Sequence, residues 1–137
     1  MTQNFSVLLV DDSEALLKAT QTILELEGYK VITTNSGTDA LIAFETQQFH
    51  AVVLDFNLPD IGGEILAERM AKADPNVRIV MFSGAENIPS MALRHVDWLV
   101  KKGEAGNQLV EQLARLLAGN KRSDKGPTSG LSLSTMN

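Results

Sequence analysis

Residues 7–13 read VLLVDDS, a run of four apolar residues followed directly by two adjacent carboxylates, Asp11 and Asp12. Like charges repel, and burying even one carboxylate without a partner costs several kcal/mol. The pair therefore indicates that a cation belongs beside it. The apolar run that leads to the pair has the length and character of a buried strand, and further runs of this kind follow along the chain.

Five apolar runs of strand length occur along the chain. Three of them are nearly continuous in apolar character instead of alternating, which is typical of strands that helices cover on both faces. The runs therefore predict a five-stranded parallel sheet. Their positions are residues 5–10, 29–33, 51–54, 77–82 and 96–100.

The segments between the runs have the apolar spacing of amphipathic helices. Gly28 and the sequence Asp74-Pro75-Asn76 are typical of the places where such helices stop. The fourth connection leaves about a dozen residues for loop and helix, near the minimum for a parallel crossover, so its helix is expected to be only a turn or two long. Helices are predicted at residues 15–26, 40–44, 65–71, 89–94 and 109–117, which gives an α/β fold of five βα units.

Composition limits the classes of function. With 12 Lys and Arg against 17 Asp and Glu, the net charge is -5, which argues against binding nucleic acid or an anionic membrane through bulk charge. The chain has no cysteine, so disulfides, thiolate zinc sites and cysteine nucleophiles are excluded. No apolar run approaches the roughly 18 residues of a membrane span, and residues 1–6 lack the basic flank of a secretory signal. We therefore expect a cytoplasmic protein.

The length of the chain favours one domain, over residues 1–118. From residue 119 the sequence is polar, rich in Gly and Ser and without periodicity. We expect residues 119–137 to form a disordered tail.

Polar residues follow directly after four of the predicted strands. They are Asp11 and Asp12, Asp55, Ser83 and Lys101. In open α/β sheets functional groups gather at the carboxyl ends of the strands. If the first and third strands are neighbours, the three carboxylates share a pocket suited to a hard divalent cation, Mg²⁺ most simply, with Mn²⁺ as a substitute.

These residues have the chemistry needed for phosphoryl transfer, which depends on positioning and on neutralising charge. Asp55 is the expected nucleophile, because it lies between the acidic pair and the lysine in the predicted sheet. Ser83 can donate a hydrogen bond to one phosphoryl oxygen, and Lys101 can place its charge on another.

The motifs around these positions resemble the receiver domain of two-component response regulators. The resemblance covers about residues 5–118, and its most specific part is the Asp55-x-x-x-Pro59 segment with Gly63. The matching segments are LVDDS (9–13), VLDFNLPDIGG (53–63), MFSGA (81–85) and WLVK (98–101).

The resemblance implies a doubly wound sheet of strand order 2-1-3-4-5 in three layers, with the fourth helix shortened here. It implies that Asp55 is the phosphoacceptor, that Asp11 and Asp12 serve the metal, and that the main-chain carbonyl of Asn57 completes the protein ligands. Ser83 and Lys101 would contact the phosphoryl group. The chain would be a signalling switch rather than an enzyme, assisting only its own phosphorylation and dephosphorylation. A sensor histidine kinase or a histidine phosphotransfer protein would be the donor, and a downstream protein the partner.

Two positions depart from the family pattern or extend it. The family normally follows its lysine with proline in a cis peptide bond, whereas Lys102 follows Lys101 here, so the loop is expected to run trans and Lys102 competes for the role. Trp98 occupies the position of an aromatic residue whose rotamer follows phosphorylation in the family, which makes Trp98 and Ser83 the candidate switch pair.

Other interpretations of the same residues remain open. Either Asp11 or Asp12 alone could cap the helix that begins near Ser13, and Ser83 alone could be a turn residue. Lys101 could be a solvated strand end, and Trp98 could simply pack.

For the whole protein, the alternative is a phosphorylation-independent receiver-like module that binds a protein partner. An aspartate-nucleophile phosphatase is disfavoured, because Asn57 stands where such enzymes usually offer an acidic group.

Overall fold

The computed structural model describes residues 4–103 and 108–119 of the 137-residue chain. The predicted tail lies outside these residues except for Gly119, so the division at residue 118 stays a prediction. Strands and helices alternate from β1 to α4, with a 3₁₀ helix, η1, between the last two strands. The elements are β1 Ser6–Val10, α1 Glu14–Leu26, β2 Lys30–Thr34, α2 Gly37–Thr46, β3 Ala51–Leu54, α3 Gly63–Ala73, β4 Arg78–Ser83, η1 Ser90–Leu93, β5 Trp98–Lys101 and α4 Gln108–Ala118.

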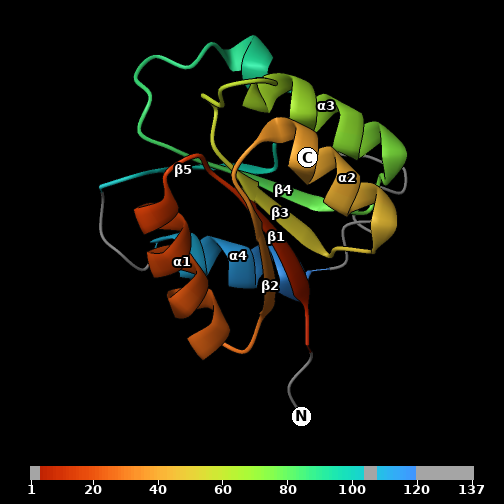
Figure 1. The fold of residues 1–137 in the computed structure, drawn as a ribbon, viewed down its shortest axis with the longest axis vertical. Helices are drawn as coiled ribbons and strands as arrows, with labels where there is room; N and C mark the ends of the chain where they lie inside the picture. Colours follow the sequence, from red (N-terminus) through yellow and green to blue (C-terminus); the bar gives the residue numbers. More distant parts are fainter. Residues whose placement is uncertain (1–3, 104–107, 120–137) are drawn as a thin grey trace.

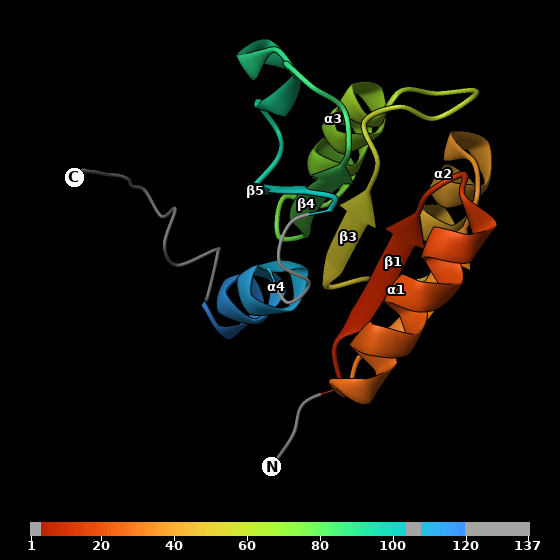
Figure 2. The same ribbon diagram turned by 90° about the vertical axis from the view of Figure 1, so that its left-hand side faces the viewer.

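The five strands form one parallel sheet in the order β2-β1-β3-β4-β5, which confirms the predicted fold and strand order. Helices α1 and α4 cover one face of this sheet, and α2 and α3 cover the other (Figures 1 and 2). Strand β1 lies between β2 and β3, so the chain reverses its direction of travel across the sheet there. The carboxyl ends of β1 and β3 therefore meet at the switch point, where ligands bind in folds of this kind.

Two apolar clusters fill the space between the sheet and its helices. On the α2 and α3 face, alternate strand residues such as Leu8 and Leu54 pack with Leu66 and Met70. On the α1 and α4 face, the intervening strand residues pack with Leu17, Leu24, Leu109 and Leu113. Residues 7–10 of β1 and all of β3 are buried, which explains why these strands are continuous apolar runs in the sequence.

The predicted helix stops are found in the structure. Gly28 has a φ of 100°, a left-handed backbone that favours glycine, and its amide donates to the carbonyl oxygen of Glu25 as α1 ends. Asp74 follows the last residue of α3, and its side chain accepts a hydrogen bond from the amide of Asn76 at 3.0 Å. Both positions turn the chain back toward the next strand.

The shortened fourth helix is also found, as the single 3₁₀ turn η1. The strand after it begins at Trp98, two residues later than predicted, because the amide of Val96 donates to the carbonyl oxygen of Leu93 and so belongs to the turn. Within the described residues, no helix is both long and apolar enough to cross a membrane.

Candidate metal centre

Three carboxylates meet at the carboxyl ends of β1 and β3. One oxygen from each of Asp11, Asp12 and Asp55 lies within 4.8 Å of the others. The two strands are paired in parallel with Val10 opposite Leu54, so the residues that follow them are carried to the same edge of the sheet. Asp11 is 4% exposed and Asp55 is 7% exposed, whereas Asp12 faces solvent.

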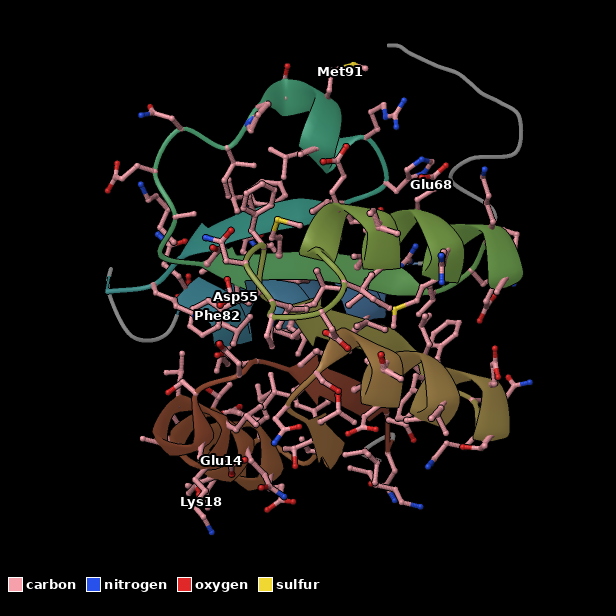
Figure 3. All side chains as sticks on the ribbon, turned by 45° about the horizontal axis from the view of Figure 1, so that its top comes forward. Glu14, Lys18, Asp55, Glu68, Phe82 and Met91 are labelled. Carbon is pink, nitrogen blue, oxygen red and sulfur yellow. The ribbon has the colours of Figure 1, made fainter. Side chains whose placement is uncertain are left out.

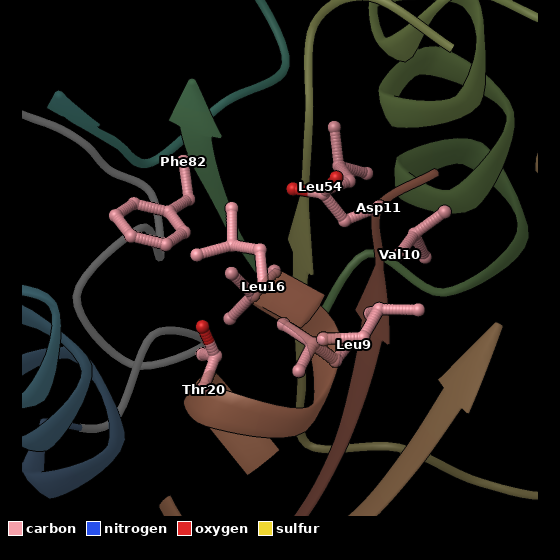
Figure 4. Close-up of a pocket in the computed structure, with 9 residues that line it drawn as sticks. Leu9, Val10, Asp11, Leu16, Thr20, Leu54 and Phe82 are labelled. Carbon is pink, nitrogen blue, oxygen red and sulfur yellow. The ribbon is translucent and has the colours of Figure 1, made fainter. Parts of the chain in front are cut away.

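The surroundings of Asp11 are largely apolar. Side chains of β1, β3, β4 and α1 line the closely filled space beside it, including Leu16 and Phe82 (Figure 4). A carboxylate in such a position is stable only when its charge is compensated. The buried acids therefore need cationic or hydrogen-bonding partners nearby.

One oxygen of each buried acid is engaged by backbone. Asp11 Oδ1 accepts from the amide of Ser13 at 2.9 Å, and Asp55 Oδ1 accepts from the amide of Asn57 at 3.4 Å. The hydroxyl of Ser13 in turn caps α1 by accepting from the amide of Leu16 at 3.3 Å. In this structure Ser13, rather than Asp11 or Asp12, supplies the side-chain cap of α1.

The remaining oxygens of the two buried acids face the ammonium group of Lys102. Its Nζ lies 2.6 Å from Asp11 Oδ2 and 3.0 Å from Asp55 Oδ2. It also lies 5.9 Å from the centre of the Phe82 ring, at the outer limit of a cation–π contact. Figure 3 shows Asp55 and Phe82 at this edge of the molecule. Burial by itself lowers the pKa of Lys102, but the hydrogen bonds to Asp11 and Asp55 outweigh that effect, and the pKa is raised.

The structure does not bring the ammonium of Lys101 to the aspartates. Its Nζ lies 3.6 Å from Glu86 Oε1 in an exposed ion pair. In this structure Lys102, and not Lys101, places an ammonium beside Asp11 and Asp55, and the phosphoryl-contacting role of Lys101 stays a prediction. No described peptide bond is cis, so the Lys101–Lys102 bond is trans, as expected.

Side-chain alternation explains why Lys102 and not Lys101 reaches the acids. Val100 packs in the cluster on the α1 and α4 face, together with Val53 and Leu9, whereas Leu99 packs on the opposite face. Successive strand residues point to opposite faces, so Lys102 follows Val100 as Asp55 follows Val53. The alternation of strand side chains could therefore have predicted from the sequence that Lys102 lies on the same face as Val100.

Ser83 and Trp98 occupy different environments. Ser83 is 1% exposed, its Oγ accepts from the amide of Ala85 at 3.1 Å, and its carbonyl oxygen accepts from the amide of Lys102 at 3.0 Å. Trp98 pairs with Val80 in the sheet, three residues before the pair of Lys101 with Ser83, and is 46% exposed. The indole therefore stands partly in solvent, about 10 Å along the strand from Ser83.

The donor set fits a hard divalent cation. The three carboxylates carry three formal negative charges, and the ammonium of Lys102, which contacts Asp11 and Asp55, compensates one of them. Every side-chain ligand offered is a carboxylate oxygen, the type that Mg²⁺ and Mn²⁺ prefer over softer ligands. Asn57, whose carbonyl is the predicted fourth ligand, lies two residues beyond Asp55 in the same loop.

Fold and site together define a doubly wound α/β protein with a cluster of three carboxylates at the topological switch point. The family model of the response regulator receiver domain matches residues 7–114. The chain belongs to this family, whose members are signalling switches of two-component systems rather than classical enzymes.

Two curated relatives illustrate the relationship. The chain is 30% identical over 129 residues to the uncharacterized transcriptional regulatory protein YkoG of Bacillus subtilis, a match that covers 88% of this chain and 55% of YkoG. It is 29% identical over 130 residues to the response regulator SaeR of Staphylococcus aureus, covering 92% of this chain and 56% of SaeR. The chain thus spans about half the length of the curated relatives it matches.

Solved structures agree with the fold. A CheY-like receiver domain protein from Methanospirillum hungatei superposes with a TM-score of 0.83 at 27% identity, covering 88% of this chain and 99% of that chain. The response regulator TrrA of Thermotoga maritima, in complex with Mg²⁺ and BeF, superposes with a TM-score of 0.78 at 26% identity, covering 82% and 98%.

Proposed function

We propose that this chain is a phosphorelay switch that accepts a phosphoryl group on Asp55 and thereby changes its affinity for a downstream protein. The observation that carries the proposal is the meeting of three carboxylates and the Lys102 ammonium at one edge of a parallel sheet. Membership of the receiver family supports the same class of function. A cytoplasmic location, with neither nucleic acid nor membrane as partner, is part of the proposal.

The metal would be held by side-chain oxygens of Asp11, Asp12 and Asp55 and by the main-chain carbonyl of Asn57. Bound Mg²⁺, or Mn²⁺ in its place, supplies neutralisation of the negative charge between carboxylate and phosphoryl group. That TrrA of Thermotoga maritima is described in complex with Mg²⁺ and BeF supports this assignment.

In the proposed step an oxygen of Asp55 forms a bond to phosphorus while the bond from phosphorus to the histidine nitrogen of the donor breaks. The electron pair of the broken bond stays on the imidazole nitrogen, and Asp55 becomes an acyl phosphate. The donor would be a sensor histidine kinase or a histidine phosphotransfer protein. The complex of TrrA with the histidine kinase ThkA supports a donor of this class.

Two residues of this chain would hold the phosphoryl oxygens. The Ser83 hydroxyl accepts from Ala85 and keeps its own proton for donation. Lys102 already stands 3.0 Å from Asp55 Oδ2, so we assign it the role that the sequence gives to Lys101. Trp98 remains the proposed reporter of the phosphorylated state, coupled to Ser83.

Intact-mass measurement after incubation with Mg²⁺ and acetyl phosphate tests the proposal. The wild-type chain should gain one phosphoryl group, and Asp55→Asn should gain none. A gain that survives Asp55→Asn would refute the site. The absence of any gain in the wild type would favour the alternative, a receiver-like module that binds its partner without phosphorylation.

A matched pair of lysine variants tests the assignment of the cation. Loss of one preorganised charge donor commonly slows a reaction about a hundredfold. Lys102→Met should slow phosphorylation from acetyl phosphate by about that factor, while Lys101→Met should stay within about twofold of the wild type. The reverse order would return the role to Lys101.

A further inference from the structure

Asp60 links two parts of the molecule that are distant in sequence. It lies in the loop between β3 and α3, and its carboxylate reaches the first turn of α2. Oδ1 accepts from the amide of Gly37 at 2.8 Å, and Oδ2 accepts from the amide of Thr38 at 2.8 Å and from the Thr38 hydroxyl at 2.6 Å. Oδ1 also accepts from the amide of Ile61 at 2.8 Å.

These contacts complete the hydrogen bonding of the start of α2. The first amides of a helix have no partner within the helix and need one from outside. Ser36 Oγ accepts a hydrogen bond from the amide of Asp39 at 3.1 Å. The Asp60 carboxylate accepts from the amides of Gly37 and Thr38. The hydrogen bonds from Thr38 and Gly37 hold the pKa of the Asp60 carboxyl well below its usual range.

The loop and the helix also touch closely at Gly37. A methyl group added at Gly37 would lie 2.7 Å from Cβ of Ile61 and 3.1 Å from its carbonyl oxygen. Real side chains do not approach so closely, so alanine at this position would force the two segments apart. The contact thus depends on a missing side chain as well as on the Asp60 carboxylate.

The attached loop is the one that carries the site. At one end the amide of Asp55 donates to the carbonyl oxygen of Val10 at 3.1 Å, and at the other the amide of Gly63 donates to Phe56 at 2.9 Å. Between these points lies Asn57, three residues before Asp60. Asp60 is a charged anchor in this span that reaches outside the loop.

We infer that Asp60 is a positioning residue for the metal centre: by holding the loop to the first turn of α2, it fixes where Asp55 and the carbonyl of Asn57 stand. The inference rests on the proposed function, because it concerns the site in which Asp55 accepts the phosphoryl group. Residues that orient metal ligands from outside commonly contribute tenfold or more to metal affinity.

Isothermal titration calorimetry with Mg²⁺ alone tests the inference without any phosphodonor. Asp60→Asn keeps the size of the side chain but replaces one of its accepting oxygens with an amide. We expect its Mg²⁺ dissociation constant to rise about tenfold. Phosphorylation from acetyl phosphate should also slow in Asp60→Asn, and raising Mg²⁺ to saturation should recover part of the lost rate, because part of the loss comes from weaker metal binding.

Three further variants separate positioning from a general loss of structure. Thr38→Val removes only the hydroxyl contact and should weaken Mg²⁺ binding less than Asp60→Asn. Gly37→Ala should also weaken Mg²⁺ binding, because the added methyl group would push the Ile61 segment of the loop away from α2, although alanine favours the helix. Asp39→Asn removes an acid from the same turn without touching Asp60 and should leave the affinity unchanged.

Hydrogen–deuterium exchange gives a second measurement that does not depend on the metal. In Asp60→Asn, exchange should become faster in residues 56–62 and at Thr38, with the strands unchanged. An unchanged Mg²⁺ affinity in Asp60→Asn would overturn the inference, whatever the exchange shows, and leave the proposed function standing. If the wild-type chain bound no Mg²⁺, both the role of Asp60 and the proposed function would be overturned. If it bound Mg²⁺ but was not phosphorylated by acetyl phosphate, only the proposed phosphorylation would be overturned.

Discussion

Gly63 lies directly against the backbone of the proposed phosphoacceptor. A methyl group at this position would overlap the carbonyl oxygen of Asp55 and lie 2.9 Å from Cα of Phe56. Helix α3 can begin this close to the end of β3 because residue 63 has no side chain. The placement of Asp55 therefore depends on a residue eight positions later in the chain.

Substitution of Gly63 should consequently damage both stability and phosphorylation. For Gly63→Ala we expect a loss of about 1 to 3 kcal/mol in the free energy of unfolding, the usual cost of overpacking. Urea denaturation measures the first effect, and intact mass with acetyl phosphate measures the second.

Gly62→Ala is the matched control, because a methyl group there meets no atom within 4 Å. It should cost less than about 1 kcal/mol, the effect of a poorer helix cap. Equal effects of the two substitutions would contradict the importance of the close approach at Gly63.

At the level of single residues, the sequence predicts the acids better than the lysine. Asp11, Asp12 and Asp55 follow apolar runs directly, so their positions depend only on strand ends and strand order. The aim of the lysine depends on which face of β5 each residue takes, and alignment to the family motif points to Lys101. Because Val100 and Leu99 pack on opposite faces, the ammonium that reaches Asp11 and Asp55 in this structure is that of Lys102.

Among the elements, α4 is fastened to the sheet by a buried arginine. Arg78 at the start of β4 is 7% exposed, and its Nε donates to the carbonyl oxygen of Leu116 at 2.8 Å. Its Nη2 donates to the carbonyl oxygen of Gly119 at 2.6 Å. These carbonyls lie at the end of the helix, where a positive charge is favourable.

Arg78→Met should therefore destabilise the protein by about 2 to 3 kcal/mol, because it removes charged hydrogen bonds from a buried position. Urea denaturation measures the loss. Lys72→Met breaks the exposed ion pair with Glu68 and should cost at most about 0.5 kcal/mol. Similar losses for the two variants would show that Arg78 contributes no more than a surface charge.

The hydrogen bonds of Asp60 at the start of α2 make the stability of the folded protein depend on pH. The pKa of Asp60 is lower in the folded state than in the unfolded chain, where it is about 4. The stability that Asp60 contributes is therefore fully present above about pH 4. It is lost as the pH falls toward the pKa of Asp60 in the folded state. Between about pH 6 and pH 3 the urea midpoint should fall less for Asp60→Asn than for the wild type or for Asp39→Asn. A midpoint for Asp60→Asn that follows the wild type would contradict this contribution.

The elements themselves were largely predictable, because apolar runs and helical spacing report burial directly. The start of α2 was not. The predicted helix begins at residue 40, whereas α2 begins at Gly37. Its first turn is polar, and it is held partly by Asp60, which lies more than twenty residues away in the chain and leaves no mark on the local pattern.

At the scale of the whole fold, the described residues form two apolar clusters that share the same strands. Neighbouring residues of β1 and β3 point into opposite clusters, so neither cluster can be lost while the sheet remains intact. We therefore expect the two faces to unfold together in a single cooperative transition.

Leu66→Ala on α3 and Leu113→Ala on α4 test this expectation, because both leucines are 0% exposed and each belongs to a different cluster. Each should cost about 2 to 5 kcal/mol, and Trp98 fluorescence and far-UV circular dichroism should give the same urea midpoint for each variant. Leu26→Ala, at a position 82% exposed, should change stability by less than about 0.5 kcal/mol. Midpoints that differ between the two probes would show that the clusters unfold separately.

The strand order leaves β2 and β5 as the outer strands of the sheet, each with a neighbouring strand on one side only among the residues that the structure describes. Outer strands invite another chain to add a strand, and lysines at sheet edges discourage that addition. β2 begins with the exposed Lys30, and the four-residue β5 ends with Lys101. Lys101, which does not reach the acids, thus stands at the end of an outer strand, where a charged side chain disfavours the addition of a strand from another molecule.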